Sequence, residues 1–262
     1  MSKIDKSLAI LSRVSDGDTT ASMFVDPRSL LLVTLIFLCM LLSLPAIHID
    51  ILLWFAIYPI ISAPMFGMRY SSVFLQSLII LPLVLLLGIF NPIIDKTQIA
   101  SYHGIYITRG WLLFIGIIIR GLLSMQALLI LIRSIGFVGI AKALGRLGVP
   151  KFLIVQLMMI FRYIRVLIEE GVSMKTARES RGAVSKHLSL TMWSVLIGQL
   201  FLRSISRAER IHKAMVARGF NGEMVFLYQN ENMWGWSSTI FLLSWSFIFI
   251  CLRLFNLSLL FV

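Results

Sequence analysis

The chain has 262 residues, of which 58% are hydrophobic and only 14% are charged, and its formal net charge is +12. Soluble domains typically contain about 25% charged residues, so this composition excludes an ordinary soluble domain and indicates an integral membrane protein. Residues 133–220 carry a net charge of +11, nearly all of the excess. By the positive-inside rule, we expect that region to face the cytoplasm.

The first part of the chain, residues 1–28, is polar and contains no long apolar core. We therefore expect a cytoplasmic N-terminal segment and no cleavable signal peptide. At its end, Asp26 and Pro27 form a helix start signal, because Asp is a favoured N-cap and Pro suits the first helical position.

The long apolar runs within residues 29–132 predict a transmembrane bundle of about four spans. Pro59 and Pro64 are expected to kink the second span, and the polar residues 91–110 are expected to form an outer loop. Arg120 lies inside the fourth span, where a charge is costly; we expect it to face a partner within the bundle rather than a substrate. The predicted spans are about 29–47, 51–68, 73–90 and 111–132.

The basic region 133–220 predicts two long cytoplasmic helices. Gly145–Pro150 is a break, after which one helix should run from Pro150 to about Arg181 and a second over residues 187–219. The apolar first half of the second helix is a possible further span. Residues 221–262 contain a final span near 238–255, so the fold class is an all-α polytopic membrane bundle with about five or six spans.

The second long helix is amphipathic. One stripe is apolar and another is largely basic, and the helix closes on Gly219, a residue suited to a left-handed C-terminal cap. The first helix ends similarly at Arg181-Gly182. The apolar stripe comprises Phe201, Ile205, Ala208, Ile211 and Met215, and the basic one comprises Arg203, Arg207, Arg210 and Lys213.

The sequence lacks the common catalytic motifs. It contains no P-loop, H-E-x-x-H or C-x-x-C pattern, and its four histidines are scattered. Glu169 and Glu170 are adjacent, so on a helix they point in different directions and form no catalytic dyad. We therefore predict no catalytic residues, no metal site, no cofactor and no nucleic-acid partner.

Residues 202–220 resemble the signature of the transmembrane energy-coupling component of energy-coupling factor transporters, most closely its cobalt/nickel branch. Leu147–Pro150 and Phe161–Ile164 extend the resemblance, which covers most of the chain. Proteins of that family carry a small-Arg-small motif at the end of each of two cytoplasmic coupling helices. Ala177-Arg178-Glu179 also fits this loose pattern, and Arg181 is preferred because Gly182 follows it.

The resemblance implies a non-catalytic subunit of an ATP-driven importer in a bacterial or archaeal cell membrane. Its partners would be two ABC-type ATPases, which bind ATP and magnesium, and a small membrane subunit that binds the substrate, a cobalt or nickel ion or a vitamin. The residues implied for ATPase docking are Ser180, Arg181, Gly182, Ala217, Arg218 and Gly219, supported by Arg178, Arg207, Arg210 and Met215.

Three other functions stay open from the residues alone. An autonomous permease is favoured by Arg120 and by the proline-broken spans. A membrane enzyme would need converging carboxylates or histidines. A plain membrane anchor with a basic, lipid-binding face predicts that Arg181 and Arg218 matter no more than Arg203 or Lys213.

Overall fold

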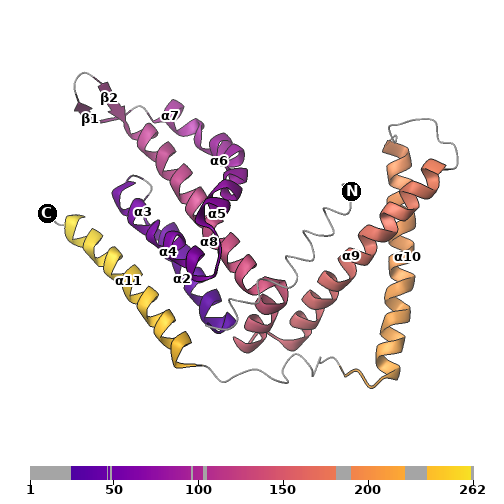
Figure 1. The fold of residues 1–262 in the computed structure, drawn as a ribbon. Helices are drawn as coiled ribbons and strands as arrows, with labels where there is room; N and C mark the ends of the chain where they lie inside the picture. The colour runs from indigo at the N-terminus through magenta and orange to yellow at the C-terminus, as the bar shows by residue number, and fades with distance from the viewer. Residues whose placement is uncertain are drawn as a thin grey trace. The chain divides into compact units, whose positions relative to one another are not determined.

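A computed structural model of the chain describes residues 25–45, 47, 49–95, 97–102, 105–180, 190–221 and 235–260 (Figure 1). The chain divides into two compact units, Ser12–Ala143 with Asn232–Val262, and Met1–Leu11 with Leu144–Glu231. The elements are α2 (Pro27–Ser43), α3 (Ile49–Phe55), α4 (Ile57–Met65), α5 (Tyr70–Ser77), η2 (Leu78–Ile80), α6 (Leu81–Gly88), α7 (Phe90–Ile94), β1 (Gln98–Tyr102), β2 (Ile105–Thr108), α8 (Arg109–Arg146), α9 (Lys151–Ser180), α10 (Leu190–Ala217) and α11 (Trp236–Leu260).

The predicted helical membrane fold is confirmed. Among the described residues, three helices are long and apolar enough to cross a membrane: the run Tyr70–Ile93, α8, and Trp236–Leu254 of α11. Two shorter apolar helical stretches, Pro27–Ser43 and Ile49–Met65, coincide with the first two predicted spans. The number of crossings stays a prediction, as does the cytoplasmic segment 1–28, of which residues 1–24 lie outside the described part.

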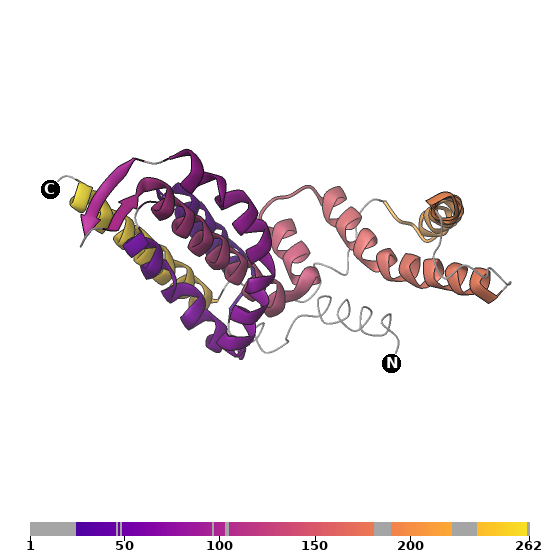
Figure 2. The same ribbon diagram turned by 90° about the horizontal axis from the view of Figure 1, so that it is seen from above.

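Helices α2 and α11 run parallel and side by side (Figures 1 and 2). As predicted, Asp26 caps α2, its carboxylate accepting a hydrogen bond from the N–H of Arg28 at 3.0 Å. The N–H of Asp26 donates to Oγ of the buried Ser238 at 2.8 Å, which joins the first turns of the two helices. Near their other ends, Arg253 Nη1 lies 3.4 Å from Met40 Sδ.

An aromatic cluster forms the core of this unit. Phe37 of α2 stacks on Tyr58 of α4 with ring centroids 4.6 Å apart, and Phe55 stacks on Phe249 of α11 at 5.8 Å. Trp245 meets Tyr58 edge-on at 5.0 Å. Such ring pairs stabilise a core beyond the burial of their area, so this cluster joins α2, α3, α4 and α11.

The predicted second and third spans are interrupted by their prolines. Pro59 has no N–H and cannot donate the backbone hydrogen bond of a continuous helix. The helix breaks one turn earlier, at Ala56, into α3 and α4. In the third span, Pro82 occupies the first turn of α6, directly after the 3₁₀ turn Leu78–Ile80. The expected kink of the second span is therefore confirmed as a break between two helices, and the third span is a continuous run of short helical segments over Tyr70–Ile93.

Helices α6 and α8 approach closely at two glycines. A methyl group on Gly121 of α8 would lie 2.7 Å from Val84 Cγ2, and one on Gly88 of α6 would lie 2.8 Å from Phe114 Cδ2. Small residues at such contacts let membrane helices pack backbone against side chain.

Arg120 lies one residue before this contact, and its Nη2 donates a hydrogen bond to the backbone carbonyl of Leu44, the C-cap of α2. The carbonyls of a helix's last turn lack partners within the helix and carry partial negative charge. Arg120 thus satisfies a helix end inside the bundle, in agreement with the expected partner there.

The expected outer loop 91–110 instead contains helix α7 and an antiparallel hairpin of β1 and β2. Between them, Thr97 donates to Asp95 Oδ1 through its hydroxyl at 2.5 Å and its N–H at 3.2 Å. These hydrogen bonds hold the pKa of Asp95 below its usual range. Polarity alone did not indicate the hairpin, because strand formation depends on cross-strand packing that composition does not report.

Helix α8 continues beyond the predicted end of the fourth span at Ile132. Its backbone leaves the helical region at Gly136, where φ is +63° and ψ is 176°, and it then resumes to Arg146. The predicted break at Gly145–Pro150 is confirmed: Val149 N–H donates to the carbonyl of Leu144 at 3.2 Å, and Gly148 has a φ of +95°. This Schellman cap ends α8, and Pro150 precedes α9.

We expect Gly121→Ala to destabilise the protein by about 1–3 kcal/mol, because the added methyl group overpacks against a β-branched side chain that cannot swing aside. Thermal unfolding in detergent measures the change. Gly198→Ala in α10 is the matched control: a methyl group there meets nothing within 4 Å. Alanine favours a helix by up to about 1 kcal/mol over glycine, so the control should be neutral or stabilising. Equal melting temperatures for the two variants would contradict the close α6–α8 contact.

Candidate functional site

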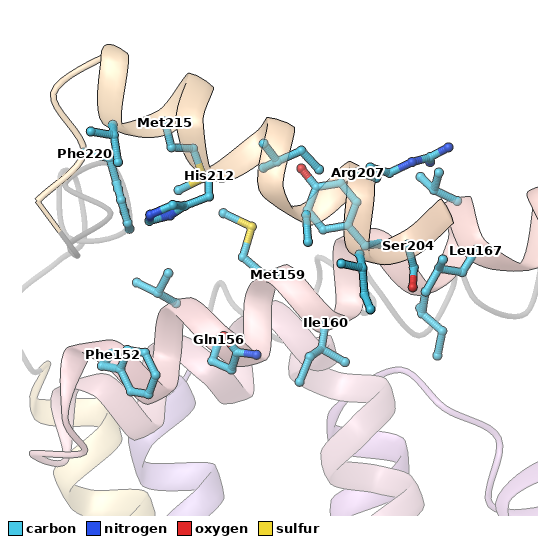
Figure 3. Close-up of a pocket in the computed structure, with 18 residues that line it drawn as sticks. Phe152, Gln156, Met159, Ile160, Leu167, Ser204, Arg207, His212, Met215 and Phe220 are labelled. Atoms are coloured by element: carbon cyan, nitrogen blue, oxygen red, sulfur yellow. The ribbon is translucent and has the colours of Figure 1, made fainter. Parts of the chain in front are cut away.

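The two long basic helices, α9 and α10, form a pair with an open groove between them (Figure 3). The groove has a volume of about 920 Å³. Both helices were predicted from the sequence, as Pro150 to about Arg181 and as 187–219, and in the structure α9 spans Lys151–Ser180 and α10 spans Leu190–Ala217.

The groove is lined by the apolar stripe of each helix. Four of the five stripe residues predicted for α10, Ile205, Ala208, Ile211 and Met215, lie along it. In Figure 3, Met159 of α9 extends toward His212 and Met215 of α10. The stripe therefore faces an open groove and not a closed core.

The stripe of α9 was not identified from the sequence. Phe152, Gln156, Met159 and Tyr163 recur at spacings of four, three and four residues, which places them on one helical face. Phe152 leaves 70% of its surface exposed. This periodicity was the available signal, but the arginines on the other faces of the helix obscured it.

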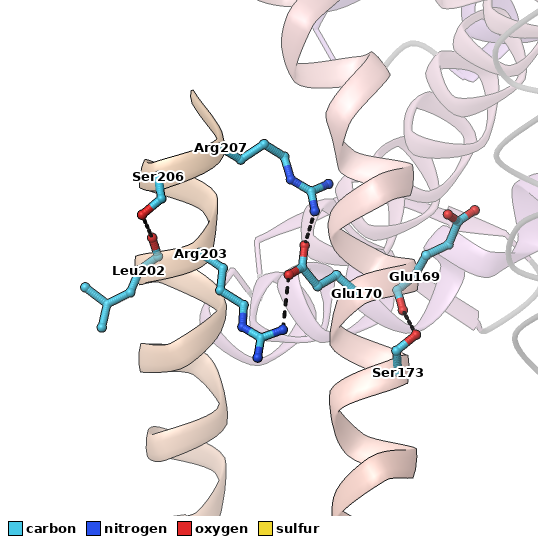
Figure 4. Close-up of polar contacts among 7 residues, drawn as sticks. All are labelled: Glu169, Glu170, Ser173, Leu202, Arg203, Ser206 and Arg207. Atoms are coloured by element: carbon cyan, nitrogen blue, oxygen red, sulfur yellow. Dashed lines mark hydrogen bonds and ion pairs between the residues drawn. The ribbon is translucent and has the colours of Figure 1, made fainter. Parts of the chain in front are cut away.

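Glu170 of α9 joins the two helices (Figure 4). Its Oε2 accepts a hydrogen bond from Arg207 Nη2 at 2.6 Å, and its Oε1 lies 3.5 Å from Arg203 Nη1. The carboxylate side chain is only 16% exposed, whereas Glu169 points away from α10. In the sequence, Glu170 stands out only as the neighbour of Glu169, and this adjacency gives no indication of its contact with α10.

The basic stripe of α10 is divided by this contact. Arg207 lines the groove and binds Glu170, and Arg203 also faces Glu170. Arg210 and Lys213, by contrast, are exposed to solvent. Arg207, which the resemblance placed among residues that support partner binding, therefore has a partner inside the chain.

The C-terminal end of α10 has a well-defined cap. Gly219 has a φ of +80°, and its N–H donates to the carbonyl of Val216 at 2.9 Å. Phe220 N–H donates to the carbonyl of Met215 at 3.0 Å, which completes a Schellman motif. The side chains of Met215 and Phe220 both line the groove. The predicted left-handed Gly219 is confirmed, and the exposed Arg218 stands at the turn.

The first Arg-Gly motif is described only in part. Ser180 is the last residue of α9; it is exposed, and its hydroxyl donates to the carbonyl of Thr176 at 3.0 Å. Arg178 is half-buried in the last turn, and Arg181 and Gly182 lie outside the described residues. Whether the six motif residues bind a partner stays a prediction.

The C-terminal ends of α9 and α10 lie far apart along the pair. Because α9 leads into α10 and the two helices contact each other, the last turn of α9 lies toward the start of α10. Helix α10 has 28 residues, which corresponds to roughly 42 Å at about 1.5 Å per residue. The last described residue of α9, Ser180, therefore lies toward the opposite end of the pair from Ala217, the last residue of α10.

No group of three or more His, Cys, Asp or Glu side chains gathers within the described residues in a way that could hold a metal ion. The absence of a metal, a cofactor and a catalytic residue in this chain stays a prediction.

We expect Gly219→Ala to weaken the end of α10, because a left-handed conformation costs a residue with a Cβ about 1–2 kcal/mol. Hydrogen exchange of the amides of Gly219 and Phe220 should become faster, while the middle of α10 keeps its protection. Gly198→Ala, in the same helix but with ordinary helical geometry, should leave these two amides unchanged. Unaltered exchange at Phe220 in Gly219→Ala would rule out the cap as the support of this end.

Comparison with known proteins identifies the family. Residues 21–227 match the model of the family described as cobalt transport protein, CbiQ. The cobalt transport protein CbiQ of Rhodobacter capsulatus is 32% identical over 84 residues, which cover 32% of this chain and 34% of the relative. A putative fused cobalt transport protein, CbiMQ, of Methanocorpusculum labreanum is 28% identical over 143 residues, 54% of this chain and 24% of the relative.

An uncharacterised protein of Methanocaldococcus jannaschii is 33% identical over 95 residues, 35% of this chain and 32% of the relative. The matched part of the chain thus spans about a quarter to a third of the length of these relatives. The family model, however, covers well over half of this chain and confirms the resemblance to the cobalt branch. The chain belongs to the cobalt transport protein (CbiQ) family.

Proposed function

We propose that this chain is the energy-coupling membrane subunit of an ATP-driven importer of the energy-coupling factor type. In this role it carries motion from two cytoplasmic ABC-type ATPases to a separate membrane subunit that binds the substrate. The family supports cobalt as the transported ion, with nickel as its chemical neighbour. The ATPases, and not this chain, bind ATP and magnesium.

The observation that carries this proposal is the α9–α10 pair, with an Arg-containing motif at the C-terminal end of each helix and an apolar groove between the helices. An arginine near a helix end can bind a carboxylate bidentately or donate to the free carbonyls of a partner helix. The small neighbours Ser180, Ala217 and Gly219 leave room for the partner's backbone. Arg218 is exposed and stands on a capped turn, so its guanidinium is accessible to a partner.

The groove supports the second part of the proposal, contact with another membrane subunit. Large apolar side chains stay exposed along this pair, among them Phe152 at 70%, Phe201 at 62% and Ile160 at 54%. Exposed apolar surfaces of this kind mark sites where a protein or a membrane covers them. The name of the fused relative joins two transport components, CbiM and CbiQ, in one chain, and this favours a membrane protein as the neighbour.

We propose that the chain lies in a bacterial or archaeal cell membrane, with its N-terminus and α9–α10 in the cytoplasm. The basic charge of residues 133–220 supports this orientation. An autonomous permease drew part of its support from Arg120 and the rest from the proline-broken spans, but Arg120 donates to the carbonyl of Leu44 and has a structural role. Arg120 therefore no longer favours a substrate path within this chain.

We expect Arg181→Glu and Arg218→Glu to release the ATPases, since each replaces a cation by an anion at a docking point. Affinity purification from native membranes in mild detergent, with mass spectrometry of the accompanying proteins, measures the loss. Wild type should bring ABC-type ATPases and a small apolar subunit, while each variant should lose at least ten-fold of the ATPase and keep the apolar subunit.

Lys213→Glu is the matched control for this experiment. Lys213 is exposed and lies in α10 five residues before Arg218, which directly follows this helix. Its substitution by glutamate changes the net charge by the same amount. If Lys213→Glu releases the ATPases as fully as Arg218→Glu does, general charge and not the motif controls assembly. A wild-type protein that purifies alone would return the permease to consideration.

A further inference from the structure

Helices α9 and α10 approach each other closely beside Glu170. A methyl group on Gly171 would lie 3.7 Å from Leu200 Cδ2, which is ordinary van der Waals contact, so Leu200 of α10 lies beside the backbone of α9 at this point. Glu170 directly precedes Gly171, and Arg203 and Arg207 follow Leu200 by one and two turns. The ion pairs and the close approach thus form one crossing point.

The Glu170–Arg207 pair at this crossing is stronger than a usual surface pair, whereas Arg203, 59% exposed, forms a weaker pair at the rim. Each carboxylate oxygen of Glu170 faces its own arginine, with Arg207 at 2.6 Å and Arg203 at 3.5 Å. The glutamate side chain is 16% exposed and that of Arg207 is 33% exposed. Partial burial reduces screening by salt, and a charged donor and acceptor form a short, strong hydrogen bond.

Beyond the crossing, the groove separates the two helices. Its lining extends from Leu167 and Ser204, beside the crossing, to Phe152 and Phe220 at the other end (Figure 3). Helices are stiff over such lengths, so a small rotation about the crossing becomes a larger displacement at Phe152 and Phe220. The contact at Glu170 opposes such a rotation, because Arg203 and Arg207 bind the same carboxylate from two successive turns of α10.

We propose that Glu170 is a positioning residue that sets the crossing of α9 and α10, and with it the width of the groove. It acts through Arg203 and Arg207. If the chain has the coupling function proposed above, which this part of the inference rests on, Glu170 also decides how far motion at one helix end reaches the groove. Glu170 itself binds no partner and takes no part in catalysis in this proposal.

The test measures the spacing of the two helices in the full-length chain. Cys39 and Cys251 are exposed free cysteines and are first replaced by serine. Spin labels are then attached to Leu153→Cys on α9 and Ala214→Cys on α10, both exposed positions outside the groove lining. Pulsed electron paramagnetic resonance in nanodiscs gives the distribution of label distances.

Glu170→Gln keeps the size of the side chain and removes its charge. We expect the distance distribution to broaden and its centre to shift, because the carboxylate no longer holds the two arginines. Arg203→Gln with Arg207→Gln should produce the same shift, and combining all three changes should add little, because the residues act as one unit. Glu169→Gln is the matched control: Glu169 is the neighbouring carboxylate, points away from α10, and should leave the distribution unchanged.

A wild-type distribution in Glu170→Gln would overturn the proposal. Circular dichroism and gel filtration verify that each variant is folded. If Glu170→Gln does not fold, Arg207→Lys keeps the charge but loses the guanidinium geometry, and it should give a smaller shift in the same direction. The distance measurement needs no partner protein, so its failure is distinct from a failure of the ATPase purification.

A second readout uses the assembled transporter in proteoliposomes. Glu170→Gln should raise the number of ATP molecules hydrolysed per imported ion at least two-fold, while the ATPase subunits stay bound. Glu169→Gln should keep the wild-type ratio. An unchanged ratio in a variant whose label distances have shifted would overturn the role of Glu170 in coupling.

Discussion

Among the described residues, an ion-pair cluster centred on Glu170 joins α9 and α10 beside a largely apolar groove. Glu170 binds Arg207 and Arg203 across the helix crossing, while the apolar stripes beyond it line an open groove. In most two-helix pairs such stripes are buried against each other and supply much of the stability. Here the stripes remain available to another surface. The ion pairs therefore hold together a pair whose hydrophobic contact is incomplete.

Polar groups serve the helix ends in both units. The N–H of Asp26 and its carboxylate organise the start of α2, and Arg120 donates to Leu44 at the end of that helix. The Schellman cap at Gly219 satisfies the last carbonyls of α10. Backbone groups at a helix end need partners wherever water is scarce, so side chains or left-handed turns supply them. Arg218 can extend from its turn because the cap has already satisfied these carbonyls.

Much of the fold could be predicted from local signals. Composition and apolar runs indicated the membrane class and the approximate spans. Asp26-Pro27, the break at Gly145–Pro150 and Gly219 marked helix boundaries that the structure confirms. The prolines of the second span indicated the break between α3 and α4, whereas the hairpin of β1 and β2 and the continuation of α8 to Arg146 were not predicted. Each of these two features depends on contacts or turn geometry beyond the window in which composition and periodicity carry a signal.

The sequence by itself determined the two long basic helices, their Arg-Gly endings and the apolar stripe of α10, because helical periodicity and capping are local properties. Only the tertiary structure decided that this stripe lines a groove with α9, and that Glu170 separates Arg203 and Arg207 from the other basic residues of α10. Glu170 and Arg207 are 37 residues apart. A pairing over that separation follows from how two helices cross, and no local pattern specifies the crossing.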